Sequence, residues 1–111
     1  MNFLAHIYLS GSDQQSMIGN FIADSVKGKE ILIYSSEIQE GIKFHRFIDT
    51  YTDTHPTILE AKKIIAPYFG KYNAVVIDIY MDHFLAKDWN HFSNVPLEAF
   101  SQSVYAILDT N

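Results

Sequence analysis

Histidine and aspartate side chains recur in this sequence at spacings that suit a shared ion. His45 and Asp49 are four residues apart, and so are Asp78 and Asp82. Residues at i and i+4 of a helix lie on one face, so the two side chains of each pair can reach a common point. Asp24 lies on a comparable face of an earlier segment. The sequence therefore places several candidate ligands where one cation could bind.

These aspartates share helical faces with apolar residues. Asp49 falls on the stripe of Ile38 and Ile42, and His6 stands inside the apolar run of residues 3–7. An ionised carboxylate is costly to bury without a compensating charge, so each needs a cation, an arginine or a metal ion nearby. Imidazole nitrogen together with carboxylate oxygen suits Mn²⁺, Mg²⁺, Zn²⁺ or iron, and such ions generate hydroxide and offset phosphoryl charge. The pattern thus favours metal-assisted phosphoryl chemistry.

Each of these residues also has an ordinary structural interpretation. A histidine on an apolar face, such as His6 or His83, is often simply hydrogen-bonded to the backbone or to a carboxylate. The other candidates could form local ion pairs or helix caps: Asp24 with Lys27, Arg46 with Asp49, and Asp53 at the start of the next helix. The coincidence of several such groups on apolar stripes favours the metal interpretation, which concerns Asp24, His45, Asp49 and Asp82.

Helices must position these side chains, and the helical periodicity and capping signals of the sequence predict an all-α chain. Ser12 and Gln15 have the spacing of a capping box, and Gly28 is suited to end the helix that they open. Ser36 opens the next helix, and Pro56 suits the first turn of the one after it. Residues 31–34 could be read as a strand, but they have no partner of similar character. The predicted helices cover residues 12–27, 36–53, 72–89 and 97–108, and a further helix begins at residue 56 and ends between residues 67 and 70. A short apolar element at residues 3–9 precedes them all.

The helix predicted at residues 72–89 has an unusual composition. Residues 75–85 are apolar on nearly every side, although they include Asp78, Asp82 and His83. A helix that is apolar all round is typically central and buried. We therefore expect this helix to lie in the middle of the fold.

Composition narrows the class of protein. The 111 residues carry a net charge of −5, which argues against a nonspecific nucleic-acid binder, and the absence of cysteine removes disulfides and thiolate metal sites. No stretch approaches the roughly 20 apolar residues of a membrane helix, and the first residues lack the features of a signal peptide. We expect one helical domain over residues 1–111, folded as a compact helical bundle. We also expect a cytoplasmic location, with neither nucleic acid nor a membrane as partner.

The order and spacing of these motifs resemble the acyl carrier protein phosphodiesterase family over residues 1–89. The matching positions form three blocks: Asn2 to His6 with Gly19, Asn20 and Asp24; Gly41, Ile42, His45, Arg46, Ile48, Asp49, Thr52, Asp53, His55 and Pro56; and Asp78, Asp82, His83, Leu85 and Trp89. The resemblance implies an α-helical fold distantly similar to HD-type phosphohydrolases. It also implies Mn²⁺-supported hydrolysis that removes 4'-phosphopantetheine from the serine of holo-acyl carrier protein.

The resemblance also implies roles for particular residues. The metal ligands that it implies are Asp24, His45, Asp49 and Asp82. Two histidines, His6 and His83, would orient a ligand or transfer a proton. Arg46 would stabilise phosphate charge, and Asp53 would orient Arg46 or a ligand.

Members of this family are considerably longer than this chain. We therefore expect the chain to be the N-terminal portion of a longer enzyme, and to self-associate through apolar surface that the rest would cover. Two other functions stay open. One is a metal phosphohydrolase acting on a nucleotide or a small phosphodiester, since fold does not fix function. The other is a non-catalytic helical fragment whose polar groups only pair with each other.

Overall fold

The computed structural model describes residues 3–11 and 13–110. Over these residues the chain forms helices and no strand, which confirms the all-α prediction. The α-helices are α1 (Phe3–Leu9), α2 (Gln14–Ile22), α3 (Ser36–Thr54), α4 (Pro56–Phe69), α5 (Asn73–Lys87) and α6 (Leu97–Thr110), and the short 3₁₀ segments are η1 (Ala23–Ser25), η2 (Gly28–Ile33), η3 (Gly70–Tyr72) and η4 (Trp89–His91). None of these helices is long and apolar enough to cross a membrane.

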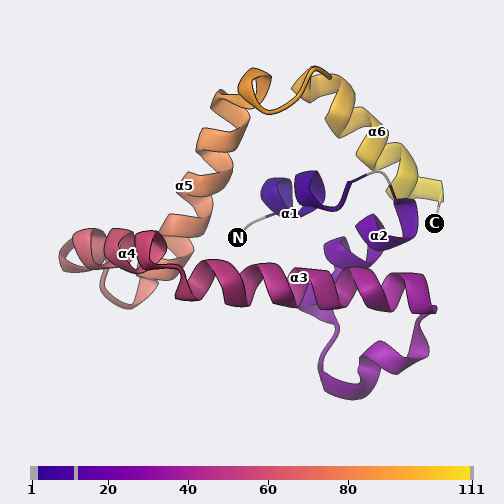
Figure 1. The fold of residues 1–111 in the computed structure, drawn as a ribbon, viewed down its shortest axis with the longest axis horizontal. Coiled ribbons are helices and arrows are strands. Elements are labelled where there is room, and N and C mark those ends of the chain that lie inside the picture. Colours follow the sequence, from indigo (N-terminus) through magenta and orange to yellow (C-terminus); the bar gives the residue numbers. More distant parts are fainter. Residues whose placement is uncertain (1–2, 12, 111) are drawn as a thin grey trace.

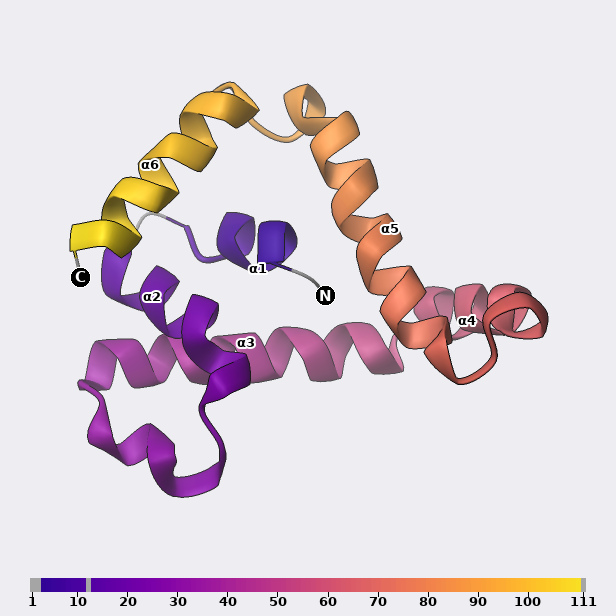
Figure 2. The ribbon, with the colours of Figure 1, turned by 180° about the vertical axis from the view of Figure 1, so that it is seen from behind.

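The helices α3, α5 and α6 form an open frame around α1 (Figure 1). Figure 1 shows α3 along one side, with α5 and α6 forming the other two sides and α1 between them. The view from behind shows the same arrangement, with α2 packed against α3 (Figure 2). The radius of gyration is 15.1 Å, whereas a compact domain of this length has about 13 Å. The helices are therefore arranged more openly than in the compact bundle that we expected.

Two glycines let the backbones of α2 and α3 touch. A Cβ atom added to Gly41 would lie 2.1 Å from the carbonyl oxygen of Ser16, and one added to Gly19 would lie 2.1 Å from the carbonyl oxygen of Ile38. Real Cβ contacts are never this short, so a side chain at either position would force the helices apart. This close crossing brings the next residue of α2, Asn20, to the face of α3 that carries His45.

The helix starts follow the predicted chemistry with small shifts. Asp13 caps α2 by accepting from the Ser16 amide, while Ser12, the predicted cap, lies outside the described residues. The cap of α3 is Ser35, one residue before the predicted start. Pro56 occupies the first turn of α4 as predicted. Local capping chemistry thus places these starts to within about one residue.

The predicted C-terminal end of the helix over residues 12–27 is wrong. We expected it to reach Lys27, but α2 ends at Ile22 and the chain continues through η1 and η2. These short segments fold back onto α3 and bury Val26 and Ile31 against Ile42. Residues 31–33, considered above as a strand, belong to η2. Burial against α3 therefore overrides continuation of the helix.

The prediction that residues 72–89 form a buried central helix is also wrong. In α5, Ile77 is the only residue with a buried side chain among those described, and Val75, Ile79 and Phe84 are each more than half exposed. The reason is that α5 packs mainly against α1 and α4. The described part of the chain leaves the other sides of α5 facing solvent, although their composition is that of a core helix.

Candidate metal site

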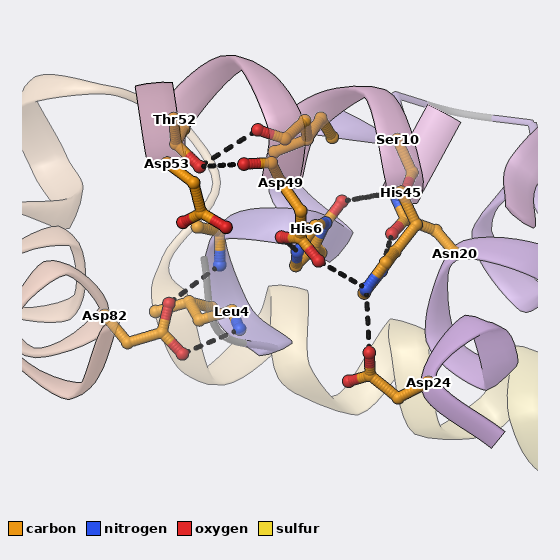
Figure 3. A network of polar contacts seen from close by, with 12 residues as sticks. Leu4, His6, Ser10, Asn20, Asp24, His45, Asp49, Thr52, Asp53 and Asp82 are labelled. Atoms are coloured by element: carbon orange, nitrogen blue, oxygen red, sulfur yellow. Dashed lines mark hydrogen bonds and ion pairs between the residues drawn. The ribbon is translucent and has the colours of Figure 1, made fainter. Parts of the chain in front are cut away.

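Residues from three helices and one 3₁₀ segment meet beside the crossing of α2 and α3. His6 comes from α1, Asn20 from α2, Asp24 from η1, and His45 and Asp49 from α3. Figure 3 shows their side chains converging on one another. The structure thus gathers three of the four predicted metal ligands, together with one of the predicted proton-transfer residues.

Asp49 joins the two histidines. Its Oδ1 lies 2.9 Å from Nε2 of His6 and its Oδ2 lies 3.2 Å from Nε2 of His45. Asp24 approaches the same nitrogen of His45, with its Oδ1 at 3.1 Å. The imidazole rings of His6 and His45 are stacked, with centroids 3.7 Å apart and planes 12° from parallel. Both rings are therefore fixed in position and present Nε2 to carboxylate oxygens.

The two histidines are buried, whereas the carboxylates are open to solvent on one side. The side chains of His6 and His45 are 2% and 5% exposed, against 33% for Asp49 and 70% for Asp24. Burial lowers the pKa of His6, the charge of His45 lowers it further, and Asp49 opposes both effects. The lowered pKa favours the neutral form of His6, which is the form that binds metals. Its Nδ1 is buried and has no hydrogen-bond partner among the described residues.

The donor set fits a divalent cation. His6, His45 and Asp49 each offer one ligand atom, and these atoms lie within 4.8 Å of one another. Asp24 adds a carboxylate oxygen beside His45. Neutral imidazole nitrogens combined with carboxylate oxygens are the ligands of Zn²⁺, Mn²⁺ and Fe²⁺ sites in proteins. A positive charge would also stabilise the arrangement in which two carboxylates converge on the same buried nitrogen.

Asp82, the fourth predicted ligand, has other partners. Its Oδ2 accepts from the Leu4 amide and its Oδ1 from the Ala5 amide, both at 3.0 Å. These amides lie in the first turn of α1, where backbone N–H groups lack partners within the helix. Asp82 thus ties α5 to the start of α1 (Figure 3), two residues before His6. It does not join the cluster of His6, His45, Asp49 and Asp24 directly.

The remaining predicted residues also lie outside the cluster. Arg46 donates from Nη2 to the carbonyl oxygen of Val26 at 3.2 Å. Asp53 lies 3.9 Å from Nζ of Lys62, so it pairs weakly with α4. His83 is exposed and contacts its neighbour Phe84 edge to face. The catalytic roles of Arg46, Asp53 and His83 stay predictions.

Two polar residues of the cluster were not among the predicted site residues. Asn20 is 1% exposed and hydrogen-bonds His45, and Ser10 contacts Asn20. The signal for Asn20 was present, because it is an amide on the apolar stripe that Met17 and Asp24 also share. Nothing in the sequence near Ser10 indicates its role, since its contacts depend on how α1 lies against α2.

Replacing Asp82 by asparagine should loosen α1. The amide group of asparagine would present N–H where one backbone N–H now donates, so one hydrogen bond would be lost. We expect the free energy of unfolding to fall by about 1–3 kcal/mol, measured by urea unfolding in EDTA. The matched control is Asp88→Asn in the exposed C-terminal cap of α5, which should change it by less than about 0.5 kcal/mol. Equal stabilities of the two variants would contradict this role.

The fold and site together define an all-helical protein with a histidine and aspartate centre suited to a cation. The family model described as acyl carrier protein phosphodiesterase matches residues 1–111, and the chain belongs to this family. Curated proteins of that name are similar to it. The one from Photorhabdus laumondii subsp. laumondii is 38% identical over 90 residues, which cover 81% of this chain and 46% of that protein. The one from Pectobacterium atrosepticum is 33% identical over 112 residues, which cover all of this chain and 58% of that protein.

A third relative, from Yersinia pestis, is 38% identical over 103 residues, covering 92% of this chain and 53% of that protein. The chain thus spans about half the length of the curated relatives it matches. No solved structure matches this chain, so the expected distant similarity to HD-type phosphohydrolases stays a prediction.

Proposed function

We propose that the chain provides the metal centre of an acyl carrier protein phosphodiesterase. In this proposal the enzyme hydrolyses the phosphodiester that links 4'-phosphopantetheine to the serine of holo-acyl carrier protein. Membership of the family supports the reaction. The observation that carries the proposal is the convergence of Asp24 and Asp49 on Nε2 of the buried His45.

The residues that would hold the cation are His6, His45, Asp49 and Asp24. We propose Mn²⁺, in accordance with the family resemblance, although the donor set also suits other divalent ions. When bound, such an ion supplies a nucleophilic hydroxide near neutral pH and offsets the charge of the phosphoryl group.

The burial of the site determines the side from which a substrate can approach. His6 and His45 are closed off by the packing of α1, α2 and α3, whereas most of the Asp24 side chain faces solvent. A phosphodiester must therefore reach the centre past Asp24 and the exposed edge of Asp49. The two rings are held by their burial and by their stacking on each other.

We propose that three exposed residues outside the cluster complete the site. Arg46 would bind phosphate oxygens, for which its permanent charge and planar donors are suited. His83 would transfer a proton, and Asp53 would orient Arg46. All three are exposed, so a bound carrier protein can reach them. Asp82 would act through α1, by fixing the helix that carries His6.

The direct test is incubation of the chain with holo-acyl carrier protein and Mn²⁺, followed by mass spectrometry of the carrier. We expect conversion to the apo form, and no conversion in EDTA. Hydrolysis of a small phosphodiester with the carrier left intact would instead favour the alternative phosphohydrolase. If neither substrate reacts with this chain or with its Photorhabdus relative, the proposal fails.

Mn²⁺ should raise the thermal midpoint of the chain relative to EDTA. A ligand that binds only the native state stabilises it by mass action, by about 2.7 kcal/mol at 100 times Kd. The shift should disappear in His45→Gln, which removes the nitrogen that both carboxylates face. Identical midpoints in Mn²⁺ and EDTA, together with the absence of metal by elemental analysis, would exclude a metal centre in this chain.

We also propose that the chain self-associates. The described residues expose large apolar side chains on several helices, including Ile64 and Tyr68 of α4, Val75 and Ile79 of α5, and Tyr105 of α6. Exposed apolar surface of this kind favours association. Sedimentation should show a smaller oligomer for a longer family member than for this chain at equal concentration. A strictly monomeric chain would contradict the expectation.

A further inference from the structure

Asn20 occupies the centre of a buried hydrogen-bond network between the two histidines. Its Nδ2 group donates to the carbonyl oxygen of His6 at 3.0 Å and to Oγ of Ser10 at 2.7 Å. Its Oδ1 lies 2.9 Å from Nδ1 of His45. Ser10 in turn donates from Oγ to the carbonyl oxygen of His6 at 2.8 Å. Figure 3 shows Asn20 and Ser10 beside the two histidines.

The network permits only one orientation of the Asn20 amide. A carbonyl oxygen can only accept, so the group that faces the His6 carbonyl must be the NH₂ group. Ser10 uses its own proton on the same carbonyl and therefore accepts from Asn20. The reversed amide would place two oxygens against each other in a site that is almost completely buried. The Oδ1 atom consequently faces His45.

This orientation decides where His45 carries its proton. Because Oδ1 of Asn20 can only accept, Nδ1 of His45 must donate. In the neutral ring Nε2 then carries the lone pair, and that lone pair points toward Asp24 and Asp49. A lone pair facing two carboxylate oxygens is repulsive unless a positive charge lies between them.

We propose that Asn20 is a positioning residue that keeps the proton of His45 on Nδ1 and thereby makes Nε2 the atom that binds a cation. A histidine that ligates a metal commonly donates its other ring N–H to an oxygen that fixes its orientation. Here the same amide also holds the backbone of His6, so one side chain sets the positions of both histidines. This inference rests on the cation site of the proposed function but does not depend on the substrate.

Nitrogen-15 NMR of the two ring nitrogens of His45 tests the proposal. In the metal-free chain at pH 9 we expect a proton on Nδ1, although free histidine favours Nε2. After addition of Zn²⁺, chosen because it is diamagnetic, Nε2 should show the shift of a metal ligand while Nδ1 keeps its proton. A bare Nδ1 at pH 9, or Zn²⁺ on Nδ1, would overturn the proposal.

Three variants separate the acceptor of Asn20 from its donors. Asn20→Leu removes both and should weaken Zn²⁺ binding by about 10- to 100-fold, measured by calorimetry. Asn20→Asp keeps an acceptor for His45 but loses the donors to His6 and Ser10, so it should keep the Nδ1 proton and bind Zn²⁺ more tightly than Asn20→Leu, although less tightly than the unmodified chain. Ser10→Ala removes only a partner of the donor side and should leave the Nδ1 proton unchanged.

A purely structural role for Asn20 gives a different pattern. In that case Asn20→Asp would be as defective in Zn²⁺ binding as Asn20→Leu, because both lack the donors. That result would overturn the proposal, as would unchanged Zn²⁺ affinity in Asn20→Leu. If Asn20→Leu does not fold, the nitrogen shifts of the unmodified chain and of Asn20→Asp still decide. If the chain does not hydrolyse holo-acyl carrier protein but His45 carries its proton on Nδ1, the proposed function is contradicted and the role of Asn20 is not.

Discussion

Asp49→Asn should abolish cation binding and hydrolysis while leaving the metal-free chain folded. Asp49 places one oxygen at Nε2 of His6 and the other at Nε2 of His45. Asparagine retains an oxygen that can accept from His6, and its NH₂ group can donate to the lone pair of His45. Stability in EDTA should therefore change by less than about 1 kcal/mol. Loss of a residue that only orients a ligand lowers cation affinity by roughly 10- to 100-fold. Asp49 is proposed as a ligand itself, so Asp49→Asn should lower cation affinity by more than that.

The size of the stability change in EDTA separates two explanations of Asp49. If its main role were to neutralise a charged, buried histidine, removal of its charge would destabilise the metal-free chain by about 3–5 kcal/mol. Urea unfolding in EDTA measures this quantity, alongside Mn²⁺ titration and turnover. The matched control is Glu40→Gln, which removes one negative charge from the exposed side of the same helix. A strongly destabilised metal-free variant, or one with near-normal turnover, would refute the assignment of Asp49 as a ligand.

Gly41→Ala should strongly destabilise the chain, although alanine is the better helix former. Intrinsic helix propensity alone predicts stabilisation of about 1 kcal/mol in the middle of α3. The new Cβ, however, would lie 2.1 Å from the Ser16 carbonyl oxygen, which is backbone and cannot rotate away. The helices would have to separate, so we expect a loss of about 3 kcal/mol in the free energy of unfolding. Cation affinity should fall as well, because Asn20 would move away from His45.

Gly28→Ala provides the control for this substitution. A Cβ at Gly28 meets no atom of the described residues within 4 Å apart from its chain neighbours, but the residue has a φ of +53°. Alanine is strained there by about 1–2 kcal/mol, without any effect on the contact between α2 and α3. We therefore expect Gly28→Ala to lower stability moderately and to leave cation affinity unchanged. A Gly41→Ala variant that is as stable as the unmodified chain would show that the helices do not cross at this distance.

Local features of the sequence determined most of the helices and part of the site. Asp13, Ser35 and Pro56 begin their helices by chemistry that acts within a few residues, so such starts can be predicted nearly to the residue. The pairing of His45 with Asp49 follows from the helical period alone, since the two are one turn apart. Helix ends were less predictable, because the end of α2 depends on burial of Val26 and Ile31 against α3.

Only the tertiary structure decided which carboxylates approach the histidines. Asp82 and Asp49 looked equivalent in the sequence, each lying on an apolar helical stripe. Asp82 meets the amides of α1, more than 70 residues away, whereas Asp49 meets His6 across 43 residues. Asn20 joins the site because Gly19 and Gly41 allow two backbones to touch. These contacts depend on the relative placement of whole helices, which periodicity within a single helix does not encode.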